Sequence, residues 1–350
     1  MHGGVLLRTA IILAALACAP AIGQEARVDR PIVIAHRGAS GERPEHTLAA
    51  YELAIERGAD FIEPDLVPTK DDVLVARHEN EIGGTTDVAK HPEFAARRTT
   101  KTIDGTSITG WFVEDFTLAE MKTLRAQERI PELRPGNATY DGRFAVPTLA
   151  EIIALAKRRS KETGRTIGIY PETKHPTYFA SVGHPTDARL VAQLKAAGWD
   201  SPSAPVFIQS FEVDNLKRIH AMTGIRLIQL MDDGAPADGA VPSYAAMGTP
   251  AGLAAVARYA WGIGPNKAAV DGTTLVADAH AAGLRVHPWT YRAENRFLPP
   301  RFASGTDPAA HGDLAGEITA ALALGIDGFF TDYPGIGVAA LDAAARKPVK

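Results

Sequence analysis

The stretch FIEPDLV (61–67) decides how this chain can fold, because it combines a buried strand with two acids. Apolar pairs at both ends indicate a strand inside the protein, yet Glu63 and Asp65 lie between them, separated by a proline. Residues i and i+2 of a strand share one face, about 6.6–6.8 Å apart along the chain. Burial makes each charge costly, so this strand is expected to end at a functional site.

The same two-part unit, a short apolar strand followed by a helix, recurs along the chain from Pro31 onward. Alanine- and leucine-rich helical stretches separate the strands, and several of these end at a glycine just before the next strand. The eight predicted strands are IVIAHRG (32–38), FIEPDLV (61–67), IGIYPET (167–173), VFIQSF (206–211), IRLIQLMD (225–232), WGIGPN (261–266), LRVHPWTY (284–291) and DGFFTDYP (327–334).

Eight strands that alternate with helices predict an α/β fold, a (β/α)8 TIM barrel. The rival fold is an open, doubly wound sheet. No glycine-rich nucleotide loop follows the first strand, and polar residues cluster at the ends of most strands. In a barrel those carboxyl ends converge on one active site, so the barrel is favoured.

A long segment, residues 80–146, interrupts the alternation after the second strand. A connection between a strand and a helix normally has a few residues, and a long one is usually functional. It contains aromatic residues and TLAEMKTLRAQ (117–127), which predicts a helix. We expect a small cap insertion over the mouth of the barrel; the alternative is a decoration remote from the substrate.

The composition is that of a soluble globular protein, with 350 residues, 45% hydrophobic and 22% charged. The net charge is −4 and no run of basic residues occurs, so nucleic acid is not an expected partner. Beyond the N-terminal segment, no stretch is long and apolar enough for a stable membrane span. The oligomeric state has no signature in the sequence.

The N-terminus has the layout of a secretory signal peptide, residues 1–23. Cleavage near Gly23 would leave one mature domain, residues 24–350, in the periplasm or outside the cell. Cys18, the one cysteine of the sequence, lies in this segment. Cleavage near Gly23 would therefore leave a mature protein without cysteine, which cannot form a disulfide. The alternative is a lipoprotein with Cys18 acylated.

A third acid extends the pattern, because IYPETK places Glu172 at the end of the third strand, after another proline. Pro64 is tolerated if the second strand ends there, where ladder hydrogen bonding stops. Unpaired carboxylates at one barrel mouth would repel, and a divalent cation removes this conflict. Glu63, Asp65 and Glu172 suit a hard ion, with Ca²⁺ expected and Mg²⁺ as the alternative.

Two histidines and two cations accompany these acids. His36 ends the first strand and His78 follows LVARHE, so the two imidazoles can supply one base and one acid. Arg37 and Lys174 would bind an anionic substrate such as a phosphate, or else pair with the acids. A lone histidine in an apolar context is more often structural; here both accompany three acids at predicted strand ends.

The motifs HRGASGERPEHT, EPDLV, RHE and PETKHP together resemble the glycerophosphodiester phosphodiesterases, especially the secreted, periplasmic type. The resemblance covers about residues 31–334. It implies a TIM barrel with a cap after the second strand, and one Ca²⁺ or similar ion. Carried over by motif, the implied metal ligands are Glu63, Asp65 and Glu172, and the implied acid–base pair is His36 and His78.

The resemblance also implies the reaction, hydrolysis of a glycerophosphodiester, such as glycerophosphocholine or glycerophosphoethanolamine, to sn-glycerol 3-phosphate and an alcohol. Arg37 and Lys174 would hold the phosphate, and the later strands contribute less distinctive pocket residues, Gln209, Phe211, Trp289 and Tyr333. Direct attack by water and closure of a cyclic phosphate both remain open, and so does the head group.

Rival functions are a barrel glycosidase, a phospholipase and a phosphodiester-binding protein without catalysis. A glycosidase needs its two carboxylates on opposite sides of the scissile bond, whereas Glu63 and Asp65 share one strand. Binding alone requires no acid–base couple, and a phospholipase would need an apolar rim, for which FLPP (297–300) is the single hint.

Overall fold

The computed structural model describes residues 1–2 and 30–346. Contacts divide the chain into Met1–Arg30 and Pro31–Lys350, and the fold below is that of the second unit. Cys18 and all but the first two residues of the expected signal peptide lie outside the described residues. Among the helices that the structure describes, none has the length and hydropathy needed to cross a bilayer.

All eight predicted strands are present, and two of them are broken in the middle. Pro64 divides the second strand into β2 and β3, and Tyr170-Pro171 divides the third into β7 and β8. The barrel strands are β1 (Ile32–His36), β2 (Phe61–Glu63), β3 (Asp65–Pro68), β7 (Gly168–Ile169), β8 (Glu172–Thr173), β9 (Phe207–Ser210), β10 (Arg226–Met231), β11 (Gly262–Pro265), β12 (Arg285–Val286) and β13 (Gly328–Thr331).

The strands pair in parallel and in chain order. Regular ladders form two arcs, β13-β1-β2-β7 and β12-β11-β10-β9-β8-β3-β4, in which β4 (Leu74–Ala76) is an antiparallel hairpin partner of β3. Single bridges link the arcs, Ile169 to Val206 and Tyr291 to Thr331, and the Tyr291 N–H donates to the Phe330 carbonyl at 2.9 Å. The fold is the predicted TIM barrel, with interruptions in its ladder.

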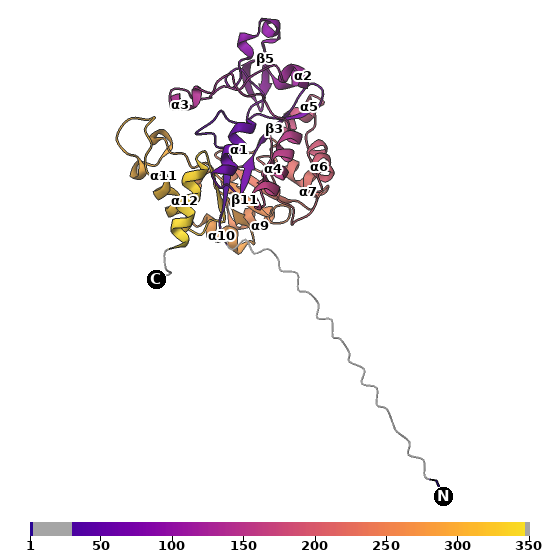
Figure 1. Ribbon diagram of the computed structural model, residues 1–350, viewed down its shortest axis with the longest axis vertical. Helices are drawn as coiled ribbons and strands as arrows, with labels where there is room; N and C mark the ends of the chain where they lie inside the picture. Colours follow the sequence, from indigo (N-terminus) through magenta and orange to yellow (C-terminus); the bar gives the residue numbers. More distant parts are fainter. Residues whose placement is uncertain (3–29, 347–350) are drawn as a thin grey trace. The chain divides into compact units, whose positions relative to one another are not determined.

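Helices cover the outside of the strands, as Figure 1 shows. Thr47, Thr148 and Asp313 cap three of them, each accepting a hydrogen bond from a backbone N–H of the first turn. The helices outside the insertion are α1 (Leu48–Glu56), α4 (Leu149–Thr163), α5 (Pro176–Ser181), α6 (Asp187–Ala196), α7 (Val213–His220), α8 (Tyr244–Met247), α9 (Pro250–Val256), α10 (Leu275–Ala281), α11 (Leu314–Ala323) and α12 (Pro334–Ala345).

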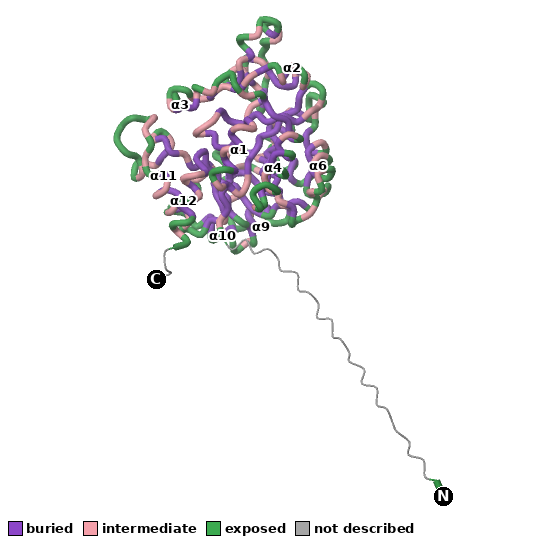
Figure 2. The backbone as a smooth tube through the Cα atoms, viewed as in Figure 1, coloured by how far each residue is buried: buried purple, intermediate pink, exposed green. Residues whose placement is uncertain are grey.

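Alternate residues of the strands fill the barrel interior, which is a packed core below the active site. Figure 2 shows the strands as almost continuously buried, with exposed backbone on the surrounding loops and outer helix faces. The interior cluster consists of Ile32, Ile34, Tyr170, Phe207, Ile228 and Phe330, with Phe61 and Trp289 packed against it. The next inward positions toward the carboxyl ends of β1, β2 and β9 are His36, Glu63 and Gln209.

Residues 80–146 form an insertion between the second strand and α4, with a separate apolar cluster. In Figure 1 its labels β5, α2 and α3 gather at one end, opposite α9 and α10. Its elements are η1 (Val88–Lys90), η2 (Pro92–Arg97), β5 (Thr99–Ile103), β6 (Thr106–Gly110), η3 (Val113–Asp115), α2 (Leu118–Met121) and α3 (Pro135–Ala138). Its cluster includes Phe94, Val113, Phe116, Met121 and Leu124 and continues onto Val67 and Val75 of the β3–β4 hairpin.

One local prediction is wrong. The helix expected over 117–127 covers only Leu118–Met121, because Ala126 then pairs with Thr86 and its N–H donates to the Phe144 carbonyl. The second strand continues past Pro64, as its predicted range 61–67 implies, but it changes partners there: β2 pairs with β1 and β7, and β3 pairs with β8 and β4. Proline lacks an N–H, but the Pro64 carbonyl still accepts from the Glu172 N–H at 2.9 Å.

Candidate active site

Three buried carboxylates meet at the carboxyl ends of the second and third strands. Glu63 ends β2, Asp65 begins β3, and Glu172 begins β8, where its backbone pairs with that of Asp65. Each side chain offers one oxygen, and these oxygens lie within 4.8 Å of one another. The structure thus brings together all three acids that the sequence analysis selected, here called the acidic trio.

The charges of the acidic trio are strongly coupled. Burial, followed by repulsion from Asp65, raises the pKa of Glu63 well above its ordinary value, and burial raises the pKa of Glu172 to about 8. Burial would raise the pKa of Asp65 too, but Lys174, His78 and His46 outweigh it and hold that pKa well below its ordinary range. When no cation is bound, burial and mutual repulsion therefore favour the protonated forms of Glu63 and Glu172.

Hydrogen bonds fix two members of the acidic trio, Glu63 and Asp65, from behind. The Arg37 N–H donates to Glu63 Oε2 at 2.8 Å, and the Gln209 Nε2 donates to Glu63 Oε1 at 3.0 Å. His46 Nε2 lies 2.9 Å from Asp65 Oδ2, and its Nδ1 lies 2.8 Å from the Tyr51 hydroxyl. Because these partners restrict rotation, the oxygens are held in place before any ligand binds.

The donor set fits a hard divalent cation. Its members are carboxylate oxygens, which Ca²⁺ and Mg²⁺ prefer, and the residues that the structure describes include no cysteine. Gln209, which donates to Glu63, also has a buried carbonyl oxygen Oε1 without a hydrogen-bond partner. A cation at the acidic trio would displace the protons, end the repulsion between the carboxylates and offer that oxygen a partner.

His36 lies at the end of β1 with its ring anchored by an acid. Its Nδ1 lies 2.6 Å from Asp332 Oδ1, and Asp332 follows β13 at the neighbouring strand end. An ionised carboxylate only accepts hydrogen bonds, so the proton is on Nδ1 and Nε2 has a free lone pair. Burial and the charge of Arg37 lower the pKa of His36 to about 4, although Asp332 raises it. The imidazole is therefore neutral near pH 7.

His78 follows β4 and is anchored in the same way. Its Nδ1 lies 2.5 Å from Glu79 Oε1, which again leaves Nε2 free. Burial and the positive charges of Arg37 and Lys174 lower the pKa of His78 to about 3. A phosphate bound by these two cations would neutralise their effect and allow His78 to take up a proton more readily.

Arg37 and Lys174 both pair with acids of the site. Arg37 Nη1 donates to Glu45 Oε2 at 3.1 Å, while its Nε is buried, lies 3.5 Å from Asp65 Oδ2 and has no hydrogen-bond partner. The backbone of Arg37 is left-handed, with φ 59°, which turns the chain sharply after β1. Lys174 Nζ lies 2.8 Å from Glu172 Oε1. Both cations thus contact acids, as the alternative expected, and both lie beside the acidic trio.

Phe211 and Trp289 form an aromatic wall beside the cations. Both rings are partly exposed, their centroids are 5.7 Å apart, and Lys174 Nζ lies 5.7 Å from the Phe211 centroid. Tyr333, the remaining predicted pocket residue, is directed elsewhere, because its hydroxyl donates to Glu294 Oε1 at 2.7 Å. The wall gives the site an apolar side next to Lys174.

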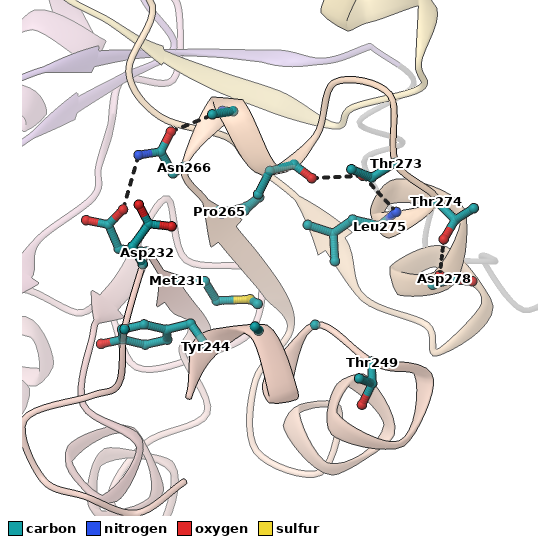
Figure 3. Close-up of a pocket in the computed structure, with 16 residues that line it drawn as sticks. Met231, Asp232, Tyr244, Thr249, Pro265, Asn266, Thr273, Thr274, Leu275 and Asp278 are labelled. Carbon is teal, nitrogen blue, oxygen red and sulfur yellow. Dashed lines mark hydrogen bonds between the residues drawn. The ribbon is translucent and has the colours of Figure 1, made fainter. Parts of the chain in front are cut away.

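A cavity of about 450 Å³ lies next to this wall, at the ends of β10 and β11 (Figure 3). Met231, Asp232, Tyr244 and Asn266 contribute to its lining, and Asn266 Nδ2 donates to Asp232 Oδ1 at 3.1 Å. Neither the acidic trio nor His36 and His78 line it. The cavity lies beside the candidate site, whose residues come from the ends of other strands.

The sequence analysis missed several residues that hold the site. Asp332 lies in a predicted strand, two residues after the inward-facing Phe330. Because side chains alternate along a strand, the sequence predicts that Asp332 also points inward. Glu79 is next to His78 in sequence. Arg129 and Arg134, which bind Glu79 and Asp332, come from the insertion and carry no periodic signal.

Comparisons with known proteins identify the family of the chain. The glycerophosphoryl diester phosphodiesterase family pattern matches residues 36–336. A glycerophosphodiester phosphodiesterase of Arabidopsis thaliana is 38% identical over 331 residues, 88% of this chain and 85% of the relative. The Haemophilus influenzae enzyme of the same name is 32% identical over 342 residues, 88% of each chain.

Solved structures share the fold. The structure of an Oleispira antarctica phosphodiesterase in complex with the product sn-glycerol-3-phosphate has a TM-score of 0.61 at 23% identity. The match covers 90% of this chain and 98% of that one. The family match and the sequence relatives show that the chain belongs to the glycerophosphoryl diester phosphodiesterase family and is an enzyme with glycerophosphodiester phosphodiesterase activity.

Proposed function

We propose that the enzyme hydrolyses glycerophosphodiesters, such as glycerophosphocholine and glycerophosphoethanolamine, to sn-glycerol 3-phosphate and an alcohol, with a divalent cation and the pair His36 and His78. The observation that carries the proposal is the acidic trio, buried beside Arg37 and Lys174. The product of the Oleispira antarctica phosphodiesterase, sn-glycerol-3-phosphate, supports the same choice of product. The test is release of glycerol 3-phosphate from glycerophosphocholine, first in EDTA and then with Ca²⁺ restored.

In this mechanism the chain binds the diester and moves two protons. Arg37 and Lys174 hold the phosphate oxygens, and the acidic trio holds Ca²⁺, or Mg²⁺ as the alternative. When bound, the cation supplies positive charge that offsets the charge developing on the phosphate. One imidazole takes the proton of the attacking oxygen at Nε2, and the other, which must be protonated at Nε2 in the substrate complex, donates that proton to the departing alkoxide as the phosphorus–oxygen bond breaks.

Cation affinity is expected to rise with pH. Glu172 has a pKa of about 8 in the cation-free protein and must lose its proton to bind the ion. Below that pKa each binding event releases the Glu172 proton, and with it any proton held by Glu63, so the affinity increases at least about tenfold per pH unit between pH 6 and 7.5.

Calorimetric titration of Ca²⁺ in two buffers of different ionisation enthalpy measures the released protons. Glu172→Gln is expected to bind Ca²⁺ too weakly to titrate, so Glu56→Gln, on the exposed side of α1, is the matched control and should release as many protons as the parent protein. An affinity that does not change between pH 6 and 8 would contradict the protonated acidic trio.

The aromatic wall is expected to select a cationic alcohol. A quaternary ammonium over an indole ring gains about 1–2 kcal/mol, so Trp289→Leu should raise KM for glycerophosphocholine about 5–30-fold. The KM for glycerophosphoglycerol, which has a neutral head group, should change less. Trp261→Leu is the control, because Trp261 precedes β11 at the opposite end of the barrel. Equal losses for both substrates would contradict the assignment.

We also propose export to the periplasm or cell exterior, with residues 1–23 removed as a signal peptide. When the full chain is produced in a Gram-negative host, mass spectrometry of the periplasmic fraction should find a mature N-terminus at Gln24. A protein in the membrane fraction that begins with an acylated Cys18 would replace this proposal with the lipoprotein alternative.

A further inference from the structure

Two arginines of the insertion reach the carboxylates that anchor the two histidines. Arg129 binds Glu79, which is the partner of His78, and Arg134 binds Asp332, which is the partner of His36. We propose that Arg129 and Arg134 are positioning residues, through which the insertion orients the acid–base pair. The proposal rests on the proposed roles of His36 and His78.

The first contact is a fork of hydrogen bonds centred on Arg129. Its Nη1 and Nη2 donate to Glu79 Oε1 and Oε2 at 2.9 and 2.6 Å. Its Nε and Nη2 also donate to Glu45 Oε2 and Oε1 at 2.9 and 2.7 Å. Because two parallel bonds fix the plane of the Glu79 carboxylate, Oε1 stays directed at His78 Nδ1.

The second contact is more deeply buried. The Arg134 side chain is 6% exposed; its Nη2 lies 2.5 Å from Asp332 Oδ2 and its Nε 2.5 Å from Glu294 Oε1. Its Nη1 donates to the Ser40 carbonyl at 3.0 Å, in the loop that follows His36. Arg134 therefore leaves the other oxygen of Asp332, Oδ1, to accept from His36 Nδ1 at 2.6 Å.

Both arginines also keep their carboxylates ionised. Burial would raise the pKa of Asp332, but Arg134, Arg292 and His36 outweigh it and hold that pKa well below its ordinary value. The pKa of Glu79 is likewise lowered, because His78 and Arg129 outweigh burial. An ionised acceptor at Nδ1 selects the Nδ1–H tautomer of each imidazole, and so presents Nε2 for proton transfer.

These contacts differ from the other arginine pairs of the insertion. Arg97 makes a comparable fork with Glu120, at 3.0 Å for Nη1–Oε2 and 2.5 Å for Nη2–Oε1, but both residues belong to the insertion itself. Arg129 and Arg134 instead connect it to β1, β4 and β13, through partners up to 198 positions away in sequence. The insertion thus adds a contact to the carboxylate behind each histidine, and at Asp332 this contact accompanies that of Arg292, whose Nε donates to Oδ2 at 3.0 Å.

The test compares Arg129→Met and Arg134→Met with Arg97→Met as the matched control, in the full mature protein loaded with Ca²⁺. Proton–nitrogen correlation spectra of ¹⁵N-histidine-labelled protein report which ring nitrogen carries the proton, with signals assigned from His36→Ala and His78→Ala. Steady-state hydrolysis of glycerophosphocholine gives kcat and KM separately, and thermal unfolding reports folding.

We expect Arg129→Met to reduce the Nδ1–H fraction of His78 and leave that of His36 unchanged, and Arg134→Met to do the reverse. In both variants kcat should fall about 10–100-fold, which is the usual cost of removing a residue that orients a residue of the site. KM should stay within about twofold of the value for the parent protein. Arg97→Met should change neither tautomer nor kcat, whatever it does to the unfolding temperature.

If both histidines keep their tautomers in both variants, the positioning role is overturned. A rise in KM at constant kcat overturns it as well, because the arginines would then contact the substrate phosphate directly. Shifted tautomers with unchanged kcat support the positioning but overturn the acid–base roles proposed for His36 and His78. Should Arg134→Met fail to fold, since Asp332 and Glu294 lose a partner, Arg134→Lys retains the charge without the fork and is expected to give mixed tautomers.

Discussion

Replacing His36 or His78 with alanine should lower kcat for glycerophosphocholine by about 10²–10⁴-fold, the usual contribution of one acid–base group. Each imidazole has Nδ1 anchored by a carboxylate and is neutral near pH 7, so each offers Nε2 for proton transfer. Alanine removes that nitrogen without replacing it. The acidic trio is bonded by other residues, so Ca²⁺ affinity should stay close to that of the parent protein.

The measurement is a time course of glycerol 3-phosphate release at saturating substrate and Ca²⁺, together with the Ca²⁺ affinity of each variant. His220→Ala is the matched control, because His220 ends α7 with an exposed side chain and should have no effect on the rate. Retained activity in either His36→Ala or His78→Ala, at unchanged Ca²⁺ affinity, would remove that residue from the acid–base pair.

The strands and the acidic trio could be predicted because they follow from short-range rules. Alternation along a strand places residues i and i+2 on one face, and parallel barrel strands bring their carboxyl ends together. Glu63, Asp65 and Glu172 are therefore neighbours in any barrel with this strand order. The same rule applied to Phe330 predicts an inward Asp332, which the sequence analysis did not use.

The residues that hold the site could not be predicted, because loop conformation decides their contacts. Arg134 meets Asp332 across 198 positions and Arg129 meets Glu45 across 84, and neither lies in a strand or a periodic helix. The helix predicted over 117–127 ends early, at Met121, for a related reason. Its local propensity is overridden after Met121, where Leu124 packs into the apolar cluster and Ala126 pairs with Thr86.

Removing divalent cations with EDTA should lower hydrolysis by at least about 10³-fold, and Ca²⁺ should restore it, because several kcal/mol of transition-state charge stabilisation are lost. Without an ion, no positive charge at the acidic trio offsets the charge that develops on the phosphate. Glu172→Gln should be inactive to the same extent with Ca²⁺ present, since the amide removes one of three charged ligands. Rates are measured after EDTA treatment and gel filtration, with Ca²⁺ and then Mg²⁺ added back.

Thermal unfolding separates loss of the ion from loss of the fold. A ligand that binds only the native state raises the unfolding temperature, so Ca²⁺ should stabilise the parent protein but not Glu172→Gln. Glutamine resembles the protonated acid, and the pKa of about 8 keeps Glu172 largely protonated near pH 7 without a cation, so the two cation-free proteins should unfold at similar temperatures. Glu56→Gln, on the exposed side of α1, should behave as the parent protein does. Full hydrolysis in EDTA, at a temperature where the protein is folded, would contradict a role for a metal at the acidic trio. His36 and His78 would then have to act without a cation.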